Sequence, residues 1–201
     1  MLIWSRNSTP RPMQRTGSIL TFSLIRFVGS PAAPIWLLNL NPGLQQTDYH
    51  HPQHVVEMQR RSIALEAENF WYLDDKFSGT SGYDWWRKKT RRLTEHYDLT
   101  TLMRAFFVVE LFPYHSARYK PTKSLLPSQE FTRELVRAGC KAEKKFIIMR
   151  RERQWLDLVP ELITANKTEL LNVQGSWITL ENMKSPGLLK CWLDDVEDKM
   201  D

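Results

Sequence analysis

Short apolar runs alternate with amphipathic segments along most of the chain. The runs are rich in branched and aromatic residues and stop at turn-forming residues, which predicts strands at 19–28, 35–40, 106–112, 146–149 and 169–173. The segments between them predict helices over 55–70, from Asp84 to about Tyr97, from about Ser128 to Gly139, over 151–159 and after Thr179. Continuous apolar strands separated by helices need cover on both faces. The pattern therefore predicts a three-layer α/β/α domain with a mostly parallel sheet.

Two of these helices show a clear apolar face. In the first, successive separations of seven, four and three positions place four apolar residues on one helical face: Val56, Ile63, Ala67 and Phe70. In the second, Asp84 is the expected cap and the inner face is Trp86, Leu93 and Tyr97. Both faces are expected to pack against the sheet.

Composition and charge favour one globular domain over residues 1–201. With 42% hydrophobic and 25% charged positions, the chain suits one substantial core. Its apolar runs are far shorter than the roughly 20 residues of a membrane span. Residues 1–18 contain arginines and no acidic residue, which predicts a basic extension. Residues 194–201 are rich in acidic residues, which predicts an acidic tail. Two cysteines without metal or redox spacing indicate a reduced, cytoplasmic protein.

Polar residues gather where the predicted strands end. The four strand exits are NLNPG at 39–43, ELFPYHS at 110–116, MRRERQW at 149–155 and VQGSWIT at 173–179. Ligands of parallel α/β sheets bind at the carboxyl ends of the strands. Each segment alone also has the composition of a turn or helix cap. Together they predict one pocket.

Two of these segments carry a family resemblance, which covers roughly residues 35–193. NLNPG after an apolar strand resembles the G-x-N-P-G segment of single-strand-selective and mismatch-specific members of the uracil-DNA glycosylase superfamily. VQGSWIT is similar to the superfamily's second motif, H-P-S-P-L-S. The resemblance implies that Asn41 helps to position an attacking water, and that Glu110 stands where these enzymes have a base-recognising asparagine. It also implies DNA, rather than RNA, as the partner.

The chain departs from the family pattern at the base-reading positions. Asn39 replaces the opening glycine, and Gln174 replaces a histidine that stabilises the departing base. A glutamine amide donates a hydrogen bond but adds no positive charge. An ionised Glu110 accepts hydrogen bonds only, so it suits a base with amino donors, such as cytosine or a modified cytosine, better than uracil.

Residues near these positions in the sequence are further candidates for the site. Asp48 is either a second water-binding group beside Asn41 or a turn and helix cap. His115, between Tyr114 and Ser116, is a donor to phosphate or to the leaving base. We expect no metal ion and no cofactor, because no set of residues has metal-ligand spacing.

A basic segment predicts contacts with nucleic acid. WWRKKTRR at 85–92 places Arg87, Lys88, Lys89, Arg91 and Arg92 in two helical turns, and Arg87, Lys88, Arg91 and Arg92 are the expected phosphate contacts. Arg150 leaves the strand at 146–149, where it either contacts phosphate or pairs with Glu110. The resemblance places Ser176, Trp177 and Ile178 on a loop that pushes an apolar wedge into the duplex. Basic helical faces are also common as plain solvated surface.

Three functions fit these observations. The first is a DNA-binding glycosylase that excises a non-uracil or modified base after flipping it out of the stack. The second is a nucleic-acid-binding or defence-associated module that keeps the fold without the activity. The third is a hydrolase of free nucleosides or nucleotides. Catalysis requires Asn41, Asp48 and a leaving-group donor to converge, whereas binding requires only the pocket and the basic face.

Overall fold

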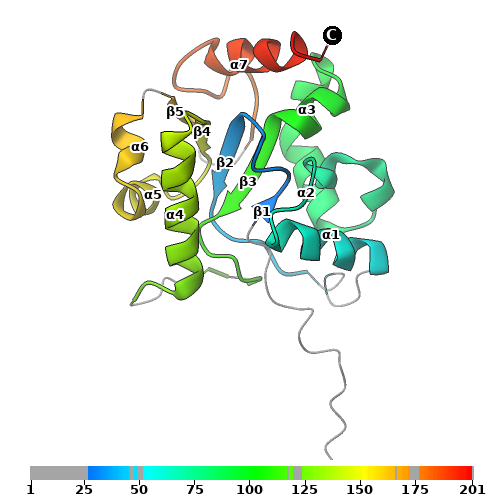
Figure 1. Ribbon diagram of the computed structural model, residues 1–201. Helices are drawn as coiled ribbons and strands as arrows, with labels where there is room; N and C mark the ends of the chain where they lie inside the picture. Colours follow the sequence, from blue (N-terminus) through cyan, green and yellow to red (C-terminus); the bar gives the residue numbers. More distant parts are fainter. Residues whose placement is uncertain are drawn as a thin grey trace, which may run out of the picture.

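The computed structural model of the chain shows helices around one five-stranded sheet (Figure 1). The described residues are 27–45, 48, 52–116, 118–119, 124–165, 167–172 and 177–200. Within them, the sheet has five strands in the order β1-β3-β2-β4-β5, and all neighbours are parallel except β1 and β3. The strands are β1 Phe27–Val28, β2 Ile35–Asn39, β3 Phe106–Glu110, β4 Lys145–Ile148 and β5 Thr168–Leu170. The prediction of a mostly parallel sheet is confirmed.

Seven α-helices and three short 3-10 helices lie in the described ranges. The α-helices are α1 Gln53–Ile63, α2 Ser81–Thr90, α3 Leu99–Ala105, α4 Pro127–Lys141, α5 Glu152–Leu158, α6 Glu161–Thr164 and α7 Leu188–Glu197. The 3-10 helices are η3 Trp71–Leu73, η4 Asp75–Phe77 and η5 Leu93–Glu95. None of the helices in the described ranges is both long and apolar enough to cross a membrane.

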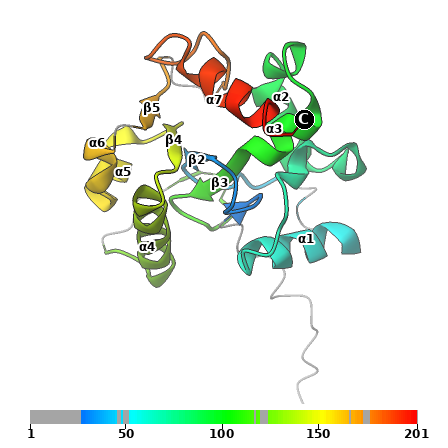
Figure 2. The same ribbon diagram turned by 45° about the horizontal axis from the view of Figure 1, so that its top comes forward.

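The helices cover both faces of the sheet (Figures 1 and 2). Alternate residues of a strand point to opposite faces, so Ile35 and Leu37 of β2 face one core, and Trp36 and Leu38 face the other. The first core also contains residues of α1, α2, α3 and α7. The second contains residues of α4, α5 and α6. By the same alternation, the last residues of β2 and β3 face the side that carries α2.

The first predicted helix is shorter than its apolar spacing suggested. Helix α1 ends at Ile63, whose side chain is exposed, and Leu65 adopts a left-handed backbone with φ of 61°. That conformation cannot continue a right-handed helix. Ala67 and Phe70 are buried, but they lie in the following loop.

The second predicted helix is split in two. Thr80, not Asp84, caps α2 by accepting a hydrogen bond from the Tyr83 amide at 3.2 Å. Helix α2 stops at Thr90, and the remainder of the segment contains η5. The predicted inner face is nevertheless buried as a whole, at Trp86, Leu93 and Tyr97.

The ends of the chain also differ from expectation. The proposed acidic tail begins inside α7, where Asp194 accepts a hydrogen bond from the Tyr97 hydroxyl at 2.7 Å and Val196 is buried. Helix α7 starts only after Gly187, which has a φ of 79°, and not directly after Thr179. The proposed basic extension at 1–18, and the strand at 19–28 up to residue 26, lie outside the described residues.

Candidate functional site

A pocket of about 290 Å³ opens at the carboxyl ends of β2, β3 and β4. Asn39 and Glu110 line it from the strand ends, and the loops that follow contribute residues 40–43 and 115–116. The first turns of α2 close one side, and Arg150 enters after β4. Segments far apart in the sequence therefore meet at the sheet edge where parallel α/β proteins bind ligands.

Asn39 and Glu110 form the floor of this pocket. They are directly opposite each other in the parallel pairing of β2 and β3, and each is the last residue of its strand. The Asn39 Nδ2 donates to Glu110 Oε1 at 3.1 Å. Both side chains are buried, and within the described part of the chain neither Asn39 Oδ1 nor Glu110 Oε2 has a hydrogen-bond partner. An unpaired buried polar atom costs about 1–3 kcal/mol, so both atoms favour a ligand that pairs with them.

The environment of Glu110 opposes its ionisation. Burial raises the pKa of Glu110 to about 8, although the Asn39 hydrogen bond and the positive charge of Arg150 act in the opposite direction. Glu110 is therefore mainly in its acid form at neutral pH. This corrects the expectation of an ionised, acceptor-only carboxylate.

Aromatic side chains wall the pocket. Tyr72, Trp85, Trp86 and Tyr119 all line it, and the rings of Trp85 and Trp86 meet edge to face with centroids 4.5 Å apart. Gly82 of α2 allows Tyr72 to approach closely, because a Cβ atom at Gly82 would lie 2.2 Å from the Tyr72 ring. Flat apolar walls beside a polar floor suit a planar, polar ring.

The loops after β2 and β3 hold two further polar groups at the pocket. The Asn41 Nδ2 donates to the Pro42 carbonyl at 2.9 Å and to Ser116 Oγ at 3.0 Å. The His115 Nδ1 lies 2.5 Å from the Gly43 carbonyl oxygen. Because a carbonyl only accepts, His115 Nδ1 carries a proton, and in the neutral ring Nε2 is then an acceptor.

Asp48 lies behind the wall of the pocket. It accepts from the Gln45 amide at 2.7 Å and from the Ser81 hydroxyl, and its Oδ2 is 4.0 Å from His115 Nδ1. Gln45, Ser81 and His115 line the pocket, whereas Asp48 does not. Asp48 thus joins both loops to α2, and the expectation that it projects into the cleft is wrong.

A basic–aromatic rim adjoins the pocket; we define it as Trp85, Lys88, Lys89, Arg150 and Trp177. The Lys89 Nζ lies 4.4 Å from the Trp177 ring centroid and 5.5 Å from that of Trp85. Lys88 Nζ is 5.9 Å from the Trp177 ring, and the Arg150 guanidinium is 5.8 Å from that of Trp85. Burial, Arg150 and Lys88 lower the pKa of Lys89. A bound anion would relieve this repulsion.

The other predicted nucleic-acid contacts have different surroundings. Arg87 packs over the Tyr83 ring at 5.8 Å, and Arg91 and Arg92 are exposed at the far end of α2. Ile178 is fully buried, and its amide donates to the Lys89 carbonyl at 3.0 Å. An apolar residue locked in the core cannot insert into a duplex, so the wedge role of Ile178 is wrong. Trp177 is 37% exposed, and its wedge role stays a prediction.

The remaining predicted site residues have mixed outcomes. Ser116 lines the pocket, but Tyr114 does not: it packs against Phe112 with ring centroids 5.1 Å apart, and the tyrosines of the described lining are Tyr72 and Tyr119. Gln174 and Ser176 lie outside the described residues.

Sequence reasoning missed several residues of the site. Tyr72 and Tyr119 carried no motif that marked them. Trp85 and Lys89 belong to the predicted basic segment, but neither was predicted as a site residue. Their spacing of four residues places them on the same helical face and was a usable signal.

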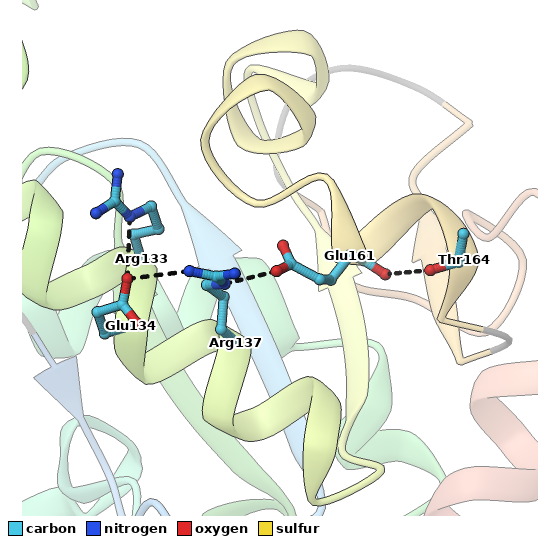
Figure 3. Close-up of polar contacts among 5 residues, drawn as sticks. All are labelled: Arg133, Glu134, Arg137, Glu161 and Thr164. Atoms are coloured by element: carbon cyan, nitrogen blue, oxygen red, sulfur yellow. Dashed lines mark hydrogen bonds and ion pairs between the residues drawn. The ribbon is translucent and has the colours of Figure 1, made fainter.

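A second hollow, of about 660 Å³, lies over α4, α5 and α6. Three of its charged side chains belong to one network with Glu134 (Figure 3): Arg133 pairs with Glu134, and Arg137 bridges Glu134 at 3.3 Å and Glu161 at 2.5 Å. These groups are exposed, and such pairs contribute little to stability.

Comparison of the chain with protein-family models, with curated proteins and with solved structures finds no match.

Proposed function

We propose that this protein binds nucleic acid, takes one base into the pocket and hydrolyses its N-glycosidic bond. One observation carries the proposal: two buried polar atoms, Asn39 Oδ1 and Glu110 Oε2, have no partner among the described residues and belong to the floor of an aromatic-walled pocket. A nucleobase is a flat ring with donors and acceptors on its edge, and it fits between such walls. The basic–aromatic rim suits the adjoining phosphates and bases.

Cleavage requires water on one side of the sugar and hydrogen bonds to the base on the other. Asn41 and His115 line the pocket beside its floor. In the proposed step, Asn41 Oδ1 orients a water molecule and His115 Nε2 accepts its proton. The water oxygen bonds to the anomeric carbon, the carbon–nitrogen bond breaks, and the base leaves with the electron pair. The base then takes up a proton from solvent, and His115 releases the proton it accepted to solvent. In this step His115 acts through Nε2, because its Nδ1 proton bonds to the Gly43 carbonyl; its donor role toward phosphate or the leaving base stays a prediction.

The resemblance to the uracil-DNA glycosylase superfamily agrees with this layout. The NLNPG segment follows β2, and the mostly parallel sheet has helices on both faces. We propose that the chain has the uracil-DNA glycosylase-like fold in divergent form. The target base is then set by Asn39 and Glu110, not by the asparagine of the uracil-specific enzymes.

A second candidate function is base binding without cleavage. The position of Asp48 favours it, because both carboxylate oxygens are engaged by Gln45 and Ser81 behind the wall. Cleavage would then lack an ionised carboxylate of the described residues near the sugar and would depend on His115 alone as the base. Binding of a base needs neither group.

A base-release screen separates the two functions. Single-stranded and duplex oligonucleotides, each with one unmodified or modified base, are incubated with the protein, and abasic sites are detected by alkaline strand cleavage. We expect release from at least one substrate, and a loss of about 100-fold or more in His115→Ala and Asn41→Ala with binding retained. His96→Ala is the control, because His96 is exposed at the C-terminal cap of η5 and does not line the pocket.

Binding by the wild type without release of any base would establish the second function. If the wild type shows neither binding nor release, the proposal as a whole is overturned.

A further inference from the structure

The floor of the pocket presents two hydrogen-bonding atoms side by side. Asn39 Nδ2 is used by Glu110 Oε1, which leaves the Asn39 Oδ1 acceptor and the second Glu110 oxygen without partners among the described residues. Whether that second oxygen donates or accepts depends on the protonation of Glu110. An acid presents a donor beside an acceptor, whereas a carboxylate presents two acceptors.

We infer that Glu110 acts in its acid form, so that the floor selects a ring edge with an N–H donor next to an acceptor atom. This inference rests on the proposed function and specifies the ligand of the same pocket. Asn39 Oδ1 accepts from the N–H of the ligand, and the Glu110 hydroxyl donates to the neighbouring nitrogen or oxygen. Uracil and cytosine both have such edges, whereas an edge with two donors leaves the Glu110 proton opposed to a donor.

The surroundings of Glu110 support this assignment. The titratable and charged side chains that share the pocket are Arg150 after β4, Tyr72 of η3, and His115 and Tyr119 of the loop after β3. Arg150 favours the carboxylate, but burial acts more strongly and brings the pKa to about 8. Burial also raises the pKa of Tyr72, so this neighbour stays neutral. A site whose buried polar groups match one edge rejects other edges strongly, because a mismatch leaves those groups unpaired.

The test is ligand binding at two pH values, measured by NMR titration with cytosine, uracil and benzamidinium. Benzamidinium is a planar cation with two adjacent N–H donors, so it suits the carboxylate. With a pKa of about 8, the acid fraction of Glu110 falls about tenfold between about pH 6 and about pH 9. Cytosine should therefore bind about tenfold more weakly at the higher pH, and benzamidinium more tightly.

Glu110→Gln is the matched variant, because glutamine offers a donor and an acceptor at every pH. It should bind cytosine within about threefold of the wild type at about pH 6 and show no pH dependence. If this variant does not fold, the opposite pH trends of cytosine and benzamidinium on the wild type still test the inference.

The outcomes distinguish this inference from the proposed function. Equal cytosine binding at both pH values, or tighter benzamidinium binding at about pH 6, would overturn the acid form and leave a base-binding pocket. If none of the three probes binds the wild type at either pH, the inference and the proposed pocket function both fail.

Discussion

Removing two charges from the basic–aromatic rim should change how nucleic-acid binding depends on salt. The variant is Lys88→Gln with Lys89→Gln, which keeps part of each apolar stem over Trp177 and Trp85. The double change also removes three cation–π contacts, two of Lys89 and one of Lys88. At a partly exposed site each contact contributes about 0.5–1 kcal/mol. We therefore expect a folded variant that is less stable by about 1.5–3 kcal/mol.

The magnitude of the binding effect follows from counterion release. Each phosphate neutralised on a single strand contributes about 0.7 to the slope of log affinity against log salt. If Lys88 and Lys89 each contact one phosphate, the double variant should lower this slope by about 1.4. Between about 50 and 200 mM salt, its affinity should then fall about sevenfold less than that of the wild type.

The assay is fluorescence anisotropy with labelled single-stranded oligonucleotides over a series of salt concentrations. Arg133→Gln with Arg137→Gln is the matched control, because it removes the same charge from the α4 surface in Figure 3. The control should keep the wild-type slope. A rim variant that is folded and has an unchanged slope, or a control that flattens it equally, would refute the placement of phosphates at the rim.

Two further predictions concern Ile178, Trp177 and Glu110. Ile178→Ala should lower the free energy of unfolding by about 2–4 kcal/mol, because Ile178 is fully buried, and should leave the affinity of the folded fraction for nucleic acid unchanged. Trp177→Ala should weaken single-strand binding by about 1–3 kcal/mol. It should lower stability by only about 1–2 kcal/mol, through the loss of its two cation–π contacts with Lys88 and Lys89; a larger loss of stability for Trp177→Ala than for Ile178→Ala in denaturant melts, with weaker binding only for Ile178→Ala in anisotropy, would show that their roles are exchanged. The folded pKa of Glu110 is raised from 4.5 to about 8, so the native state holds this proton more tightly than the unfolded chain, and its contribution to stability is lost as pH rises from about 4.5 to about 8. Glu110→Gln should flatten this decline in thermal melts, and an equal decline in both proteins would contradict the burial of an acidic Glu110.

The strands could be predicted because they have a strong local cause. Residues of β2, β3 and β4 are buried on both faces, so their sequences are nearly continuous apolar runs. The end of α1 had no comparable signal. Leu65 is an ordinary helix former by sequence, and its left-handed backbone is imposed by the tertiary structure.

The position of the site at the strand ends could be predicted from the sequence, but the pairing and protonation of its side chains could not. The strand ends marked Asn39, Asn41 and Glu110, but the pairing of Asn39 with Glu110 depends on the register of two strands far apart in sequence. The acid form of Glu110 depends on burial, which the sequence does not express. Asp48 illustrates the opposite error, because a carboxylate in a polar turn resembles a catalytic group until its partners are known.

The most direct test of the base pocket is a crystal structure of the protein with cytosine or uracil at about pH 6. We predict that the ring lies between Tyr72 and the tryptophans of α2, with its edge within about 2.7–3.2 Å of Asn39 Oδ1 and Glu110 Oε2. A base bound elsewhere on the protein, with these two oxygens contacting only water, would contradict the account.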